Sequence, residues 1–237
     1  MIDRINPQDV LFLDIETVPQ YPSFEDLPEN YKELWDKKTT YARKDTGAAE
    51  FYERAGIWAE FGRIICISAG FIFERDNRKT FRVKSFYSDD ETELLNDFKS
   101  LLISFFSKRI RARLCGHNAK EFDLPYIARR MLINGIKLPP MLNVAGLKPW
   151  EVPFLDTMEL WKFGDYKHYT SLELLSAIMG LPSPKDDIDG SQIANVYYIE
   201  NDLPRIVKYC EKDTLAVAQL FLRFKCESLI DEVERAD

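Results

Sequence analysis

Two carboxylates stand close together near the start of the chain, in the stretch "VLFLDIETVP". Residues 10–13 are a short apolar run, which is typical of a strand that is covered on both faces. Asp14 and Glu16 follow at the end of this run and are two residues apart. Strand side chains alternate, so both carboxylates point the same way and repel each other. Either they lie on a solvated loop, or a positive group lies between them.

Two further acids and a tyrosine fit the second explanation. Asp123 comes just after a second apolar strand that ends at Gly116. Tyr209 and Asp213 are four residues apart in a helical pattern, so they share one face, and that face is partly apolar. Carboxylates without a cluster of His or Cys suit Mg²⁺ or Mn²⁺ and not zinc. The pattern therefore predicts divalent cations beside these acids.

The elements that position these residues indicate an α/β fold in one domain that spans residues 1–237. Strands are expected at 63–73 and 80–87, and an amphipathic helix begins at Ser88 or Asp89 as its N-cap. Another helix starts near residue 121 and ends at Gly135, and the last third is largely helical. Residues 20–62 form a polar insertion after the first strand, with helical patterns at 28–38 and 48–59. A strand-helix-strand unit with early strands predicts a mixed sheet.

Composition limits the class of protein. A chain of 237 residues with 46% hydrophobic content can bury a sizeable core. No apolar stretch approaches the roughly 20 residues of a membrane span, and the N-terminus lacks a signal-peptide pattern. The four scattered cysteines are expected to be reduced core residues of a cytoplasmic protein. A formal net charge of −7 argues against nonspecific coating of nucleic acid, but it allows an enzyme that grips a few nucleotides.

Three segments carry a family resemblance. "FLDIETVP", "GHNAKEFDLPYI" and "YCEKDT" resemble, in this order, the three exonuclease motifs of the DEDD superfamily of 3′–5′ exonucleases. The Tyr-x3-Asp spacing of the third segment resembles the tyrosine subclass, DEDDy. The chain is most similar to stand-alone exonucleases related to the proofreading domain of family-B DNA polymerases, and "TSLELLSAIMGLPSPKDDIDGSQI" adds to this likeness. The resemblance implies a ribonuclease H-like fold, with a mixed five-stranded sheet flanked by helices. The long insertion departs from the family pattern.

The resemblance also implies a two-metal mechanism. Asp14 would bridge two ions of Mg²⁺ or Mn²⁺, and Glu16 and Asp213 would complete the site of the first ion. Asp123 would hold the second ion, and Tyr209 would orient the attacking water. The implied reaction is hydrolysis at the 3′ end of nucleic acid, preferably single-stranded DNA, which releases nucleoside 5′-monophosphates. A replication or repair protein would be a partner of such an enzyme. The alternatives are a 3′–5′ exoribonuclease and an inactive nucleic-acid-binding module of the same fold.

Several other residues leave two interpretations open. Asn118 and Phe122 resemble positions that contact the substrate strand, but an asparagine in a turn and a phenylalanine on a helix are also ordinary. His117 and His168 fit structural hydrogen bonds better than metal binding. Lys185 either contacts a phosphate or is a solvated side chain. The basic segment "SKRIRAR" either tracks a phosphate backbone along a strand or connects a helix to a strand, and we favour the connection.

The insertion is predicted to be a helical flap beside the active site. Its aromatic residues exceed what a solvated segment needs, so most of them are expected to pack on the main domain and the rest to stack on bases. These aromatic residues are Tyr31, Trp35, Phe51 and Trp58. Its basic residues are expected to contact phosphates, and they are Lys37, Lys38, Arg43 and Lys44.

Overall fold

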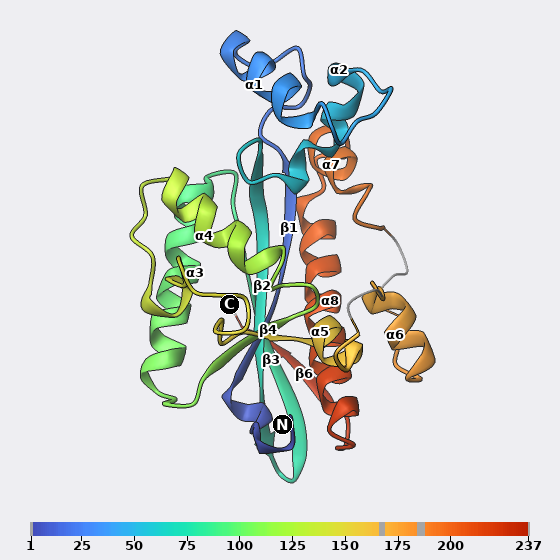
Figure 1. Cartoon of the computed structure of the whole chain (residues 1–237). Helices are drawn as coiled ribbons and strands as arrows, with labels where there is room; N and C mark the ends of the chain where they lie inside the picture. Colours follow the sequence, from blue (N-terminus) through green and yellow to red (C-terminus); the bar gives the residue numbers. More distant parts are fainter. Residues whose placement is uncertain (1, 166–168, 184–187, 237) are drawn as a thin grey trace.

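A mixed sheet of six strands, in the order β5-β4-β1-β2-β3-β6, runs through the centre of the molecule (Figure 1). The computed structural model describes residues 2–165, 169–183 and 188–236. The strands β1, β2 and β3 are antiparallel neighbours, β4 and β5 run parallel to β1, and β6 runs parallel to β3. Their bounds are β1 Val10–Pro19, β2 Gly62–Arg75, β3 Arg78–Tyr87, β4 Arg113–Gly116, β5 Leu155–Asp156 and β6 Glu232–Arg235.

The predicted mixed sheet is confirmed, but the predicted number of five strands is wrong. The sixth strand, β6, pairs with the edge that β3 would otherwise expose to water. Ion pairs from Arg78 to Glu232 and from Arg82 to Glu234 hold it there. Because β6 is short and polar, its sequence carries no strand signal of its own.

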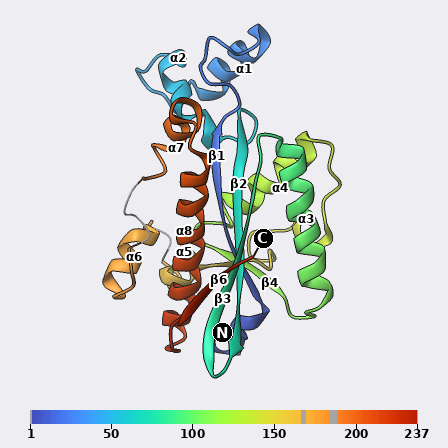
Figure 2. The same cartoon turned by 180° about the vertical axis from the view of Figure 1, so that it is seen from behind.

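Helices cover both faces of the sheet. The helices α3 and α4 lie on one face, and α8, with α5 and α6 beside it, lies on the other, as the two opposite views show (Figures 1 and 2). The N-cap of α3 is Asp90, whose side chain accepts from the backbone of Thr92 and Glu93, and not Ser88 or Asp89 as predicted. The bounds are α1 Glu29–Thr39, α2 Ala48–Phe51, α3 Glu91–Ser107, α4 Asp123–Ile133, α5 Thr157–Lys162, α6 Leu172–Ile178, α7 Ile193–Asn195 and α8 Leu203–Phe224.

Strand β1 divides its side chains between the two faces. Leu11, Leu13 and Ile15 belong to the core under α3 and α4, whereas Val10 and Phe12 pack with α8. Because β1 continues to Pro19, Asp14 and Glu16 lie within the strand and not at its end, which corrects the prediction. Pairing with β2 holds the strand together to Pro19, with a register shift between Glu16 and Thr17. Alternation therefore directs both carboxylates toward α8.

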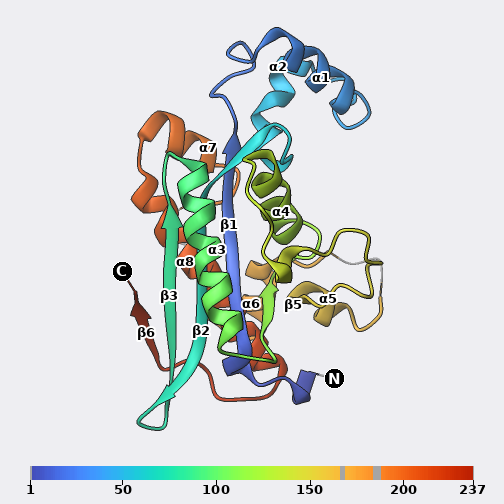
Figure 3. The same ribbon diagram turned by 90° about the vertical axis from the view of Figure 1, so that its left-hand side faces the viewer.

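The insertion, residues 20–61, stands beyond one end of the sheet (Figure 3). Its helices α1 and α2 are present as predicted, but α2 is short and continues as a 3₁₀ turn, Tyr52–Ile57. Its aromatic residues pack on one another, with Trp35 fully buried at the centre, so the expectation that they pack mainly on the main domain is wrong. The insertion therefore has a small core of its own.

Two further expectations concern the remaining sequence features. The basic segment connects α3 to β4 without forming a strand before Arg113, as favoured. Three cysteines are buried as expected, but Cys226 is exposed. Within the described residues, no helix is both long and apolar enough to cross a lipid bilayer.

Candidate active site

The end of β4 creates the space in which the acids meet. Strand β4 pairs with β1 only as far as Phe12 opposite Cys115. Beyond that point the backbone N–H of Ile15 has no strand partner on this side, and it donates to Oδ1 of Asp123 at 3.2 Å. Asp123 is the first residue of α4 and is almost fully buried. The N-terminus of α4 therefore takes the place of the next β4 residue and brings a carboxylate beside Asp14.

Helix α8 brings the remaining two residues to the same place. Its apolar side packs on β1 and β2, and the Cys210 thiol donates to the backbone oxygen of Asp14 at 3.4 Å. Tyr209 and Asp213 flank this contact on the same face of α8. The charges of Asp213, Asp123 and Glu16 all act on Asp14, so the structure brings the four predicted carboxylates into one cluster.

The electrostatics of the cluster favour protons or cations. Burial, and then the neighbouring carboxylates, raise the pKa values of Asp14 and Glu16 well above their usual range. Burial is also the main cause that raises the pKa of Asp123, to about 7. A carboxylate whose pKa is raised in this way is ionised readily only when a positive charge is nearby.

The donor set fits a hard divalent cation. Ligand atoms of Asp14, Glu16 and Cys210 lie within 4.8 Å of one another. However, burial raises the pKa of the Cys210 thiol well above its usual value, so this group stays protonated and is a poor ligand. Oδ1 of Asn118, in the loop before α4, is buried and accepts no hydrogen bond within the described part of the chain. Carboxylate oxygens are the ligands that Mg²⁺ or Mn²⁺ prefers.

The Tyr209 hydroxyl is held in its protonated form. Burial, and then the charges of Asp213, Glu16 and Asp14, raise the pKa of Tyr209 far above its usual value. The hydroxyl is hydrogen-bonded to Asp213. A phenol of this kind donates a hydrogen bond, and it does not remove protons at neutral pH.

Two clefts open on either side of the acids. One, of about 220 Å³, is lined by Asp14, Tyr209 and Asp213 together with His117 and Tyr169. The other, of about 460 Å³, is lined by Glu16 and Phe122 together with residues of the insertion. Phe122 thus lines a cleft beside Glu16, whereas Asn118 is in the adjoining loop, in a left-handed conformation (φ 62°).

A buried aspartate, Asp156, positions this loop. Asp156 caps α5 by accepting from the backbone of Met158 and Glu159. It also accepts from the backbone N–H groups of Asn118 and Lys120, at 3.0 Å each. These contacts join residues about forty positions apart, so no local signal could have revealed them.

Of the two predicted structural histidines, the structure describes only His117. The ring nitrogens of His117 each make one hydrogen bond, with Thr157 Oγ1 and with the carbonyl oxygen of Thr170, so its predicted structural role is confirmed. His168 lies outside the described residues, as do Lys185, Asp186 and Asp187.

The insertion contributes to the second cleft through residues other than those predicted. Glu53 and Arg54 line the cleft beside Glu16. Of the basic residues proposed to contact phosphates, Lys38 is paired with Glu60 and Arg43 with Asp36. Lys37 and Lys44 are exposed. A basic residue next to an aromatic run, as in "FYER", is the only sequence signal that points to Arg54.

Comparisons with known proteins identify the family and the fold. Residues 57–235 match the model of a family described as "Predicted 3'-5' exonuclease related to the exonuclease domain of PolB". This range contains Asp123, Tyr209 and Asp213, whereas Asp14 and Glu16 precede it. No curated protein matches the chain in sequence.

A solved structure shares the fold. The family B DNA polymerase from the hyperthermophilic archaeon Pyrobaculum calidifontis is similar over 88% of this chain, with a TM-score of 0.52 and 14% identity. The chain spans 23% of the length of that polymerase. At this identity the likeness concerns the α/β fold and its mixed sheet alone.

Proposed function

The chain belongs to the family of predicted 3′–5′ exonucleases related to the exonuclease domain of PolB, and we propose that it removes nucleotides from the 3′ end of single-stranded DNA as a ribonuclease H-like enzyme of the DEDDy type. One observation carries this proposal. Carboxylates from β1, α4 and α8, which are far apart in the sequence, converge on one point although their charges repel. Such repulsion lowers stability, so the cluster has no structural reason to exist without cations.

Asp14, Glu16, Asp123 and Asp213 are the residues that would hold two ions of Mg²⁺ or Mn²⁺. The central position of Asp14, on which the other three charges act, supports a bridging role for it. When bound, such ions would ease deprotonation of the attacking water and neutralise the departing 3′ oxygen.

The chain's own residues orient the reactants. The Tyr209 hydroxyl, protonated and hydrogen-bonded beside the acids, would hold the attacking water in line with the scissile bond. Phe122 offers a half-buried ring to the terminal base in the second cleft. Water adds its oxygen to phosphorus as the bond to the 3′ oxygen breaks. The products are a nucleoside 5′-monophosphate and a strand with a new 3′ hydroxyl.

The test compares single-stranded DNA and RNA of one sequence, labelled at the 5′ or the 3′ end, with Mg²⁺, Mn²⁺ or EDTA. We expect 5′-labelled DNA to shorten as a ladder and 3′-labelled DNA to release a mononucleotide at once, and EDTA to stop both. RNA should be degraded more slowly, and faster degradation of RNA would make the enzyme an exoribonuclease.

Variants assign the reaction to the site. Asp14→Asn and Asp213→Asn should each abolish turnover while the fold stays intact, because they remove charge and not packing. Asp97→Asn, on the exposed side of α3, is the matched control and should keep full activity. Full activity of Asp14→Asn or Asp213→Asn would contradict the proposed metal ligands.

A further inference from the structure

A third hollow, apolar and remote from the acids, opens between the C-terminal end of α3 and the start of β4. Its volume is about 550 Å³, and its apolar lining includes Ile103, Phe106, Ile110, Leu114, Met141 and Phe154. Leu114 and Phe154 belong to the core on the α3 face of the sheet, whereas Asp14 points toward α8. Arg113, in the lining, is level with Val10, so the groove lies about 13 Å before Asp14 along the strands. We call it the α3–β4 groove.

Two apolar side chains of this groove are open to water. Ile110 is fully exposed, and Ile103 is 49% exposed. Both side chains border a hollow and not a flat surface. A hollow of about 550 Å³ with this lining has room for apolar side chains of a partner.

The rim of the α3–β4 groove is positively charged. Arg113 lines the groove, and Lys108 and Arg111 are next in sequence to its lining residues. All three are exposed, and the described part of the chain holds no ion-pair partner for them. Arg109 has a different role. Its guanidinium stacks over the rings of Phe71 and Phe105 and donates to the backbone oxygen of Gln8, so it holds the connection between α3 and β4 in place. Three unneutralised cations at one rim are unusual in a chain with a net charge of −7.

We propose that the α3–β4 groove binds a short peptide segment of a partner protein, with apolar anchor residues flanked by Asp or Glu. The apolar lining would take the anchors, and Lys108, Arg111 and Arg113 would attract the acidic flanks. A nucleic-acid strand fits less well, because bases stack on open aromatic faces. Of the two phenylalanines in the lining, Phe154 is buried and Phe106 is partly buried.

The first experiment selects phage-displayed random peptides of about 12 residues on the full chain, after depletion on the variant Ile110→Asp. Ile110 makes no core contact, so this change should leave the fold and the exonuclease activity unaltered. We expect the enriched peptides to combine net negative charge with at least two large apolar residues. No enrichment over the Ile110→Asp variant, or enrichment without acidic residues, would overturn the proposal.

The second experiment measures the affinity of the enriched peptide by fluorescence anisotropy. Ile110→Asp, and separately Lys108→Glu with Arg111→Glu, should each weaken binding at least tenfold, and added salt should weaken it further. The matched controls are Leu132→Asp, an exposed leucine on α4, and Lys37→Glu with Lys44→Glu in the insertion. Equal loss in a control, or displacement of the peptide by single-stranded DNA, would contradict a peptide site. Because the exonuclease assay is independent of this groove, failure of either proposal leaves the other standing.

Discussion

At the scale of single residues, the site is defined by carboxylates that are buried together. Glu16 is 7% exposed and Asp123 is 4% exposed, and both lie among other acids. Removing a charge from water costs several kcal/mol per ion unless an opposite charge compensates. Without cations, burial therefore favours the protonated form of these groups. Cation binding should stabilise the fold, because only the folded chain gathers the ligands.

This leads to a prediction about pH. Without metal, the folded chain binds more protons than the unfolded chain between about pH 4 and pH 7, because the pKa of Asp123 is raised to about 7. The free energy of unfolding should therefore fall as the pH rises through this range, by on the order of 4 kcal/mol for Asp123 alone. Urea unfolding in EDTA at pH 4 and pH 8 measures this effect.

The control for the pH effect is Asp123→Asn, whose amide oxygen can still accept from the N–H of Ile15. It should be more stable than the wild type at pH 8 in EDTA, and the gap should close near pH 4. Mg²⁺ should stabilise the wild type and not the variant. A difference in stability that does not change with pH would contradict the raised pKa.

The hydroxyl of Tyr209 gives a second prediction. Tyr209→Phe keeps the ring in its buried position and removes only the group beside Asp213. Loss of one positioning hydrogen bond to the nucleophile should raise the barrier by about 2–4 kcal/mol, which lowers kcat by roughly 30- to 1000-fold. KM and the stability in Mg²⁺ should change little. An unchanged kcat would reduce Tyr209 to a packing residue.

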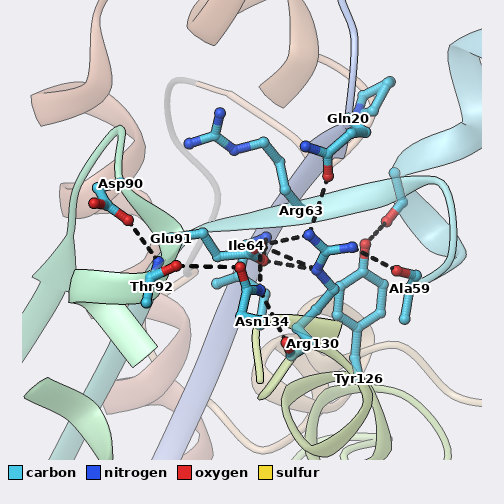
Figure 4. A network of polar contacts seen from close by, with 12 residues as sticks. Gln20, Ala59, Arg63, Ile64, Asp90, Glu91, Thr92, Tyr126, Arg130 and Asn134 are labelled. Atoms are coloured by element: carbon cyan, nitrogen blue, oxygen red, sulfur yellow. Dashed lines mark hydrogen bonds and ion pairs between the residues drawn. The ribbon is translucent and has the colours of Figure 1, made fainter. Parts of the chain in front are cut away.

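At the scale of elements, a buried polar network links α3, α4, β2 and the insertion (Figure 4). Glu91, at the start of α3, accepts from the Nε of Arg130 at 2.9 Å and from the backbone of Ile64 at 2.7 Å. Arg130 of α4 also donates to the backbone oxygen of Ala59 and to Gln20, the two ends of the insertion. Helix α4, which begins with Asp123, thus also binds both ends of the insertion through Arg130.

Breaking this network should be costly. Arg130→Met leaves the Glu91 carboxylate buried without its cation, and we expect a loss of about 3–5 kcal/mol in the free energy of unfolding. Glu60→Gln removes the exposed ion pair between Lys38 and Glu60, and it should lower the free energy of unfolding by less than about 1 kcal/mol. Thermal unfolding of both variants measures the difference. Equal stabilities would show that the buried pair is not needed to hold α4 in place.

The insertion gives an element-scale prediction about substrate. Arg54 lines the cleft beside Glu16, and its guanidinium stacks over the ring of Phe51. Arg54→Glu should weaken binding of single-stranded DNA to the inactive Asp213→Asn protein by about tenfold, because one phosphate contact is replaced by repulsion. Lys44→Glu, an equally exposed reversal away from the cleft, is the control. Equal affinities for the two variants would exclude Arg54 as a substrate contact.

At the scale of the whole molecule, most of the surface repels a nucleic-acid strand. The net charge is −7, and the basic residues of the insertion are partly neutralised by ion pairs. Apart from the basic rim of the α3–β4 groove, we therefore expect attraction to be confined to the few nucleotides that would lie in the two clefts beside the acids. Such a protein should act on ends and release long strands easily.

Salt dependence tests this view. Each phosphate contact on a single strand contributes about −0.7 to the slope of log affinity against log salt concentration. With two to four contacts, the slope should lie between about −1.4 and −2.8. It should be the same for oligonucleotides of about 6 and about 30 residues. A slope that steepens with length would reveal an extended binding track outside the clefts.

The sequence by itself determined which groups are candidates for the chemistry and how each is presented locally. Alternation along a strand sets Asp14 and Glu16 on one face, and a helical spacing of four sets Tyr209 beside Asp213. These relations depend on backbone geometry and near neighbours alone. The same is true of the helices of the insertion and of the alternating face of β1, which follow from patterns of a few residues.

Only the tertiary structure decided which of these faces meet. The contact of Asp123 with Ile15 joins residues 108 positions apart, and the sixth strand depends on pairing between β3 and the C-terminal segment. The aromatic residues of the insertion pack on one another and not mainly on the main domain, because Trp35 is completely buried among them. Which arrangement forms depends on the free energy of the whole packed structure. That free energy includes all the surfaces that are buried together, so short sequence patterns do not reveal it.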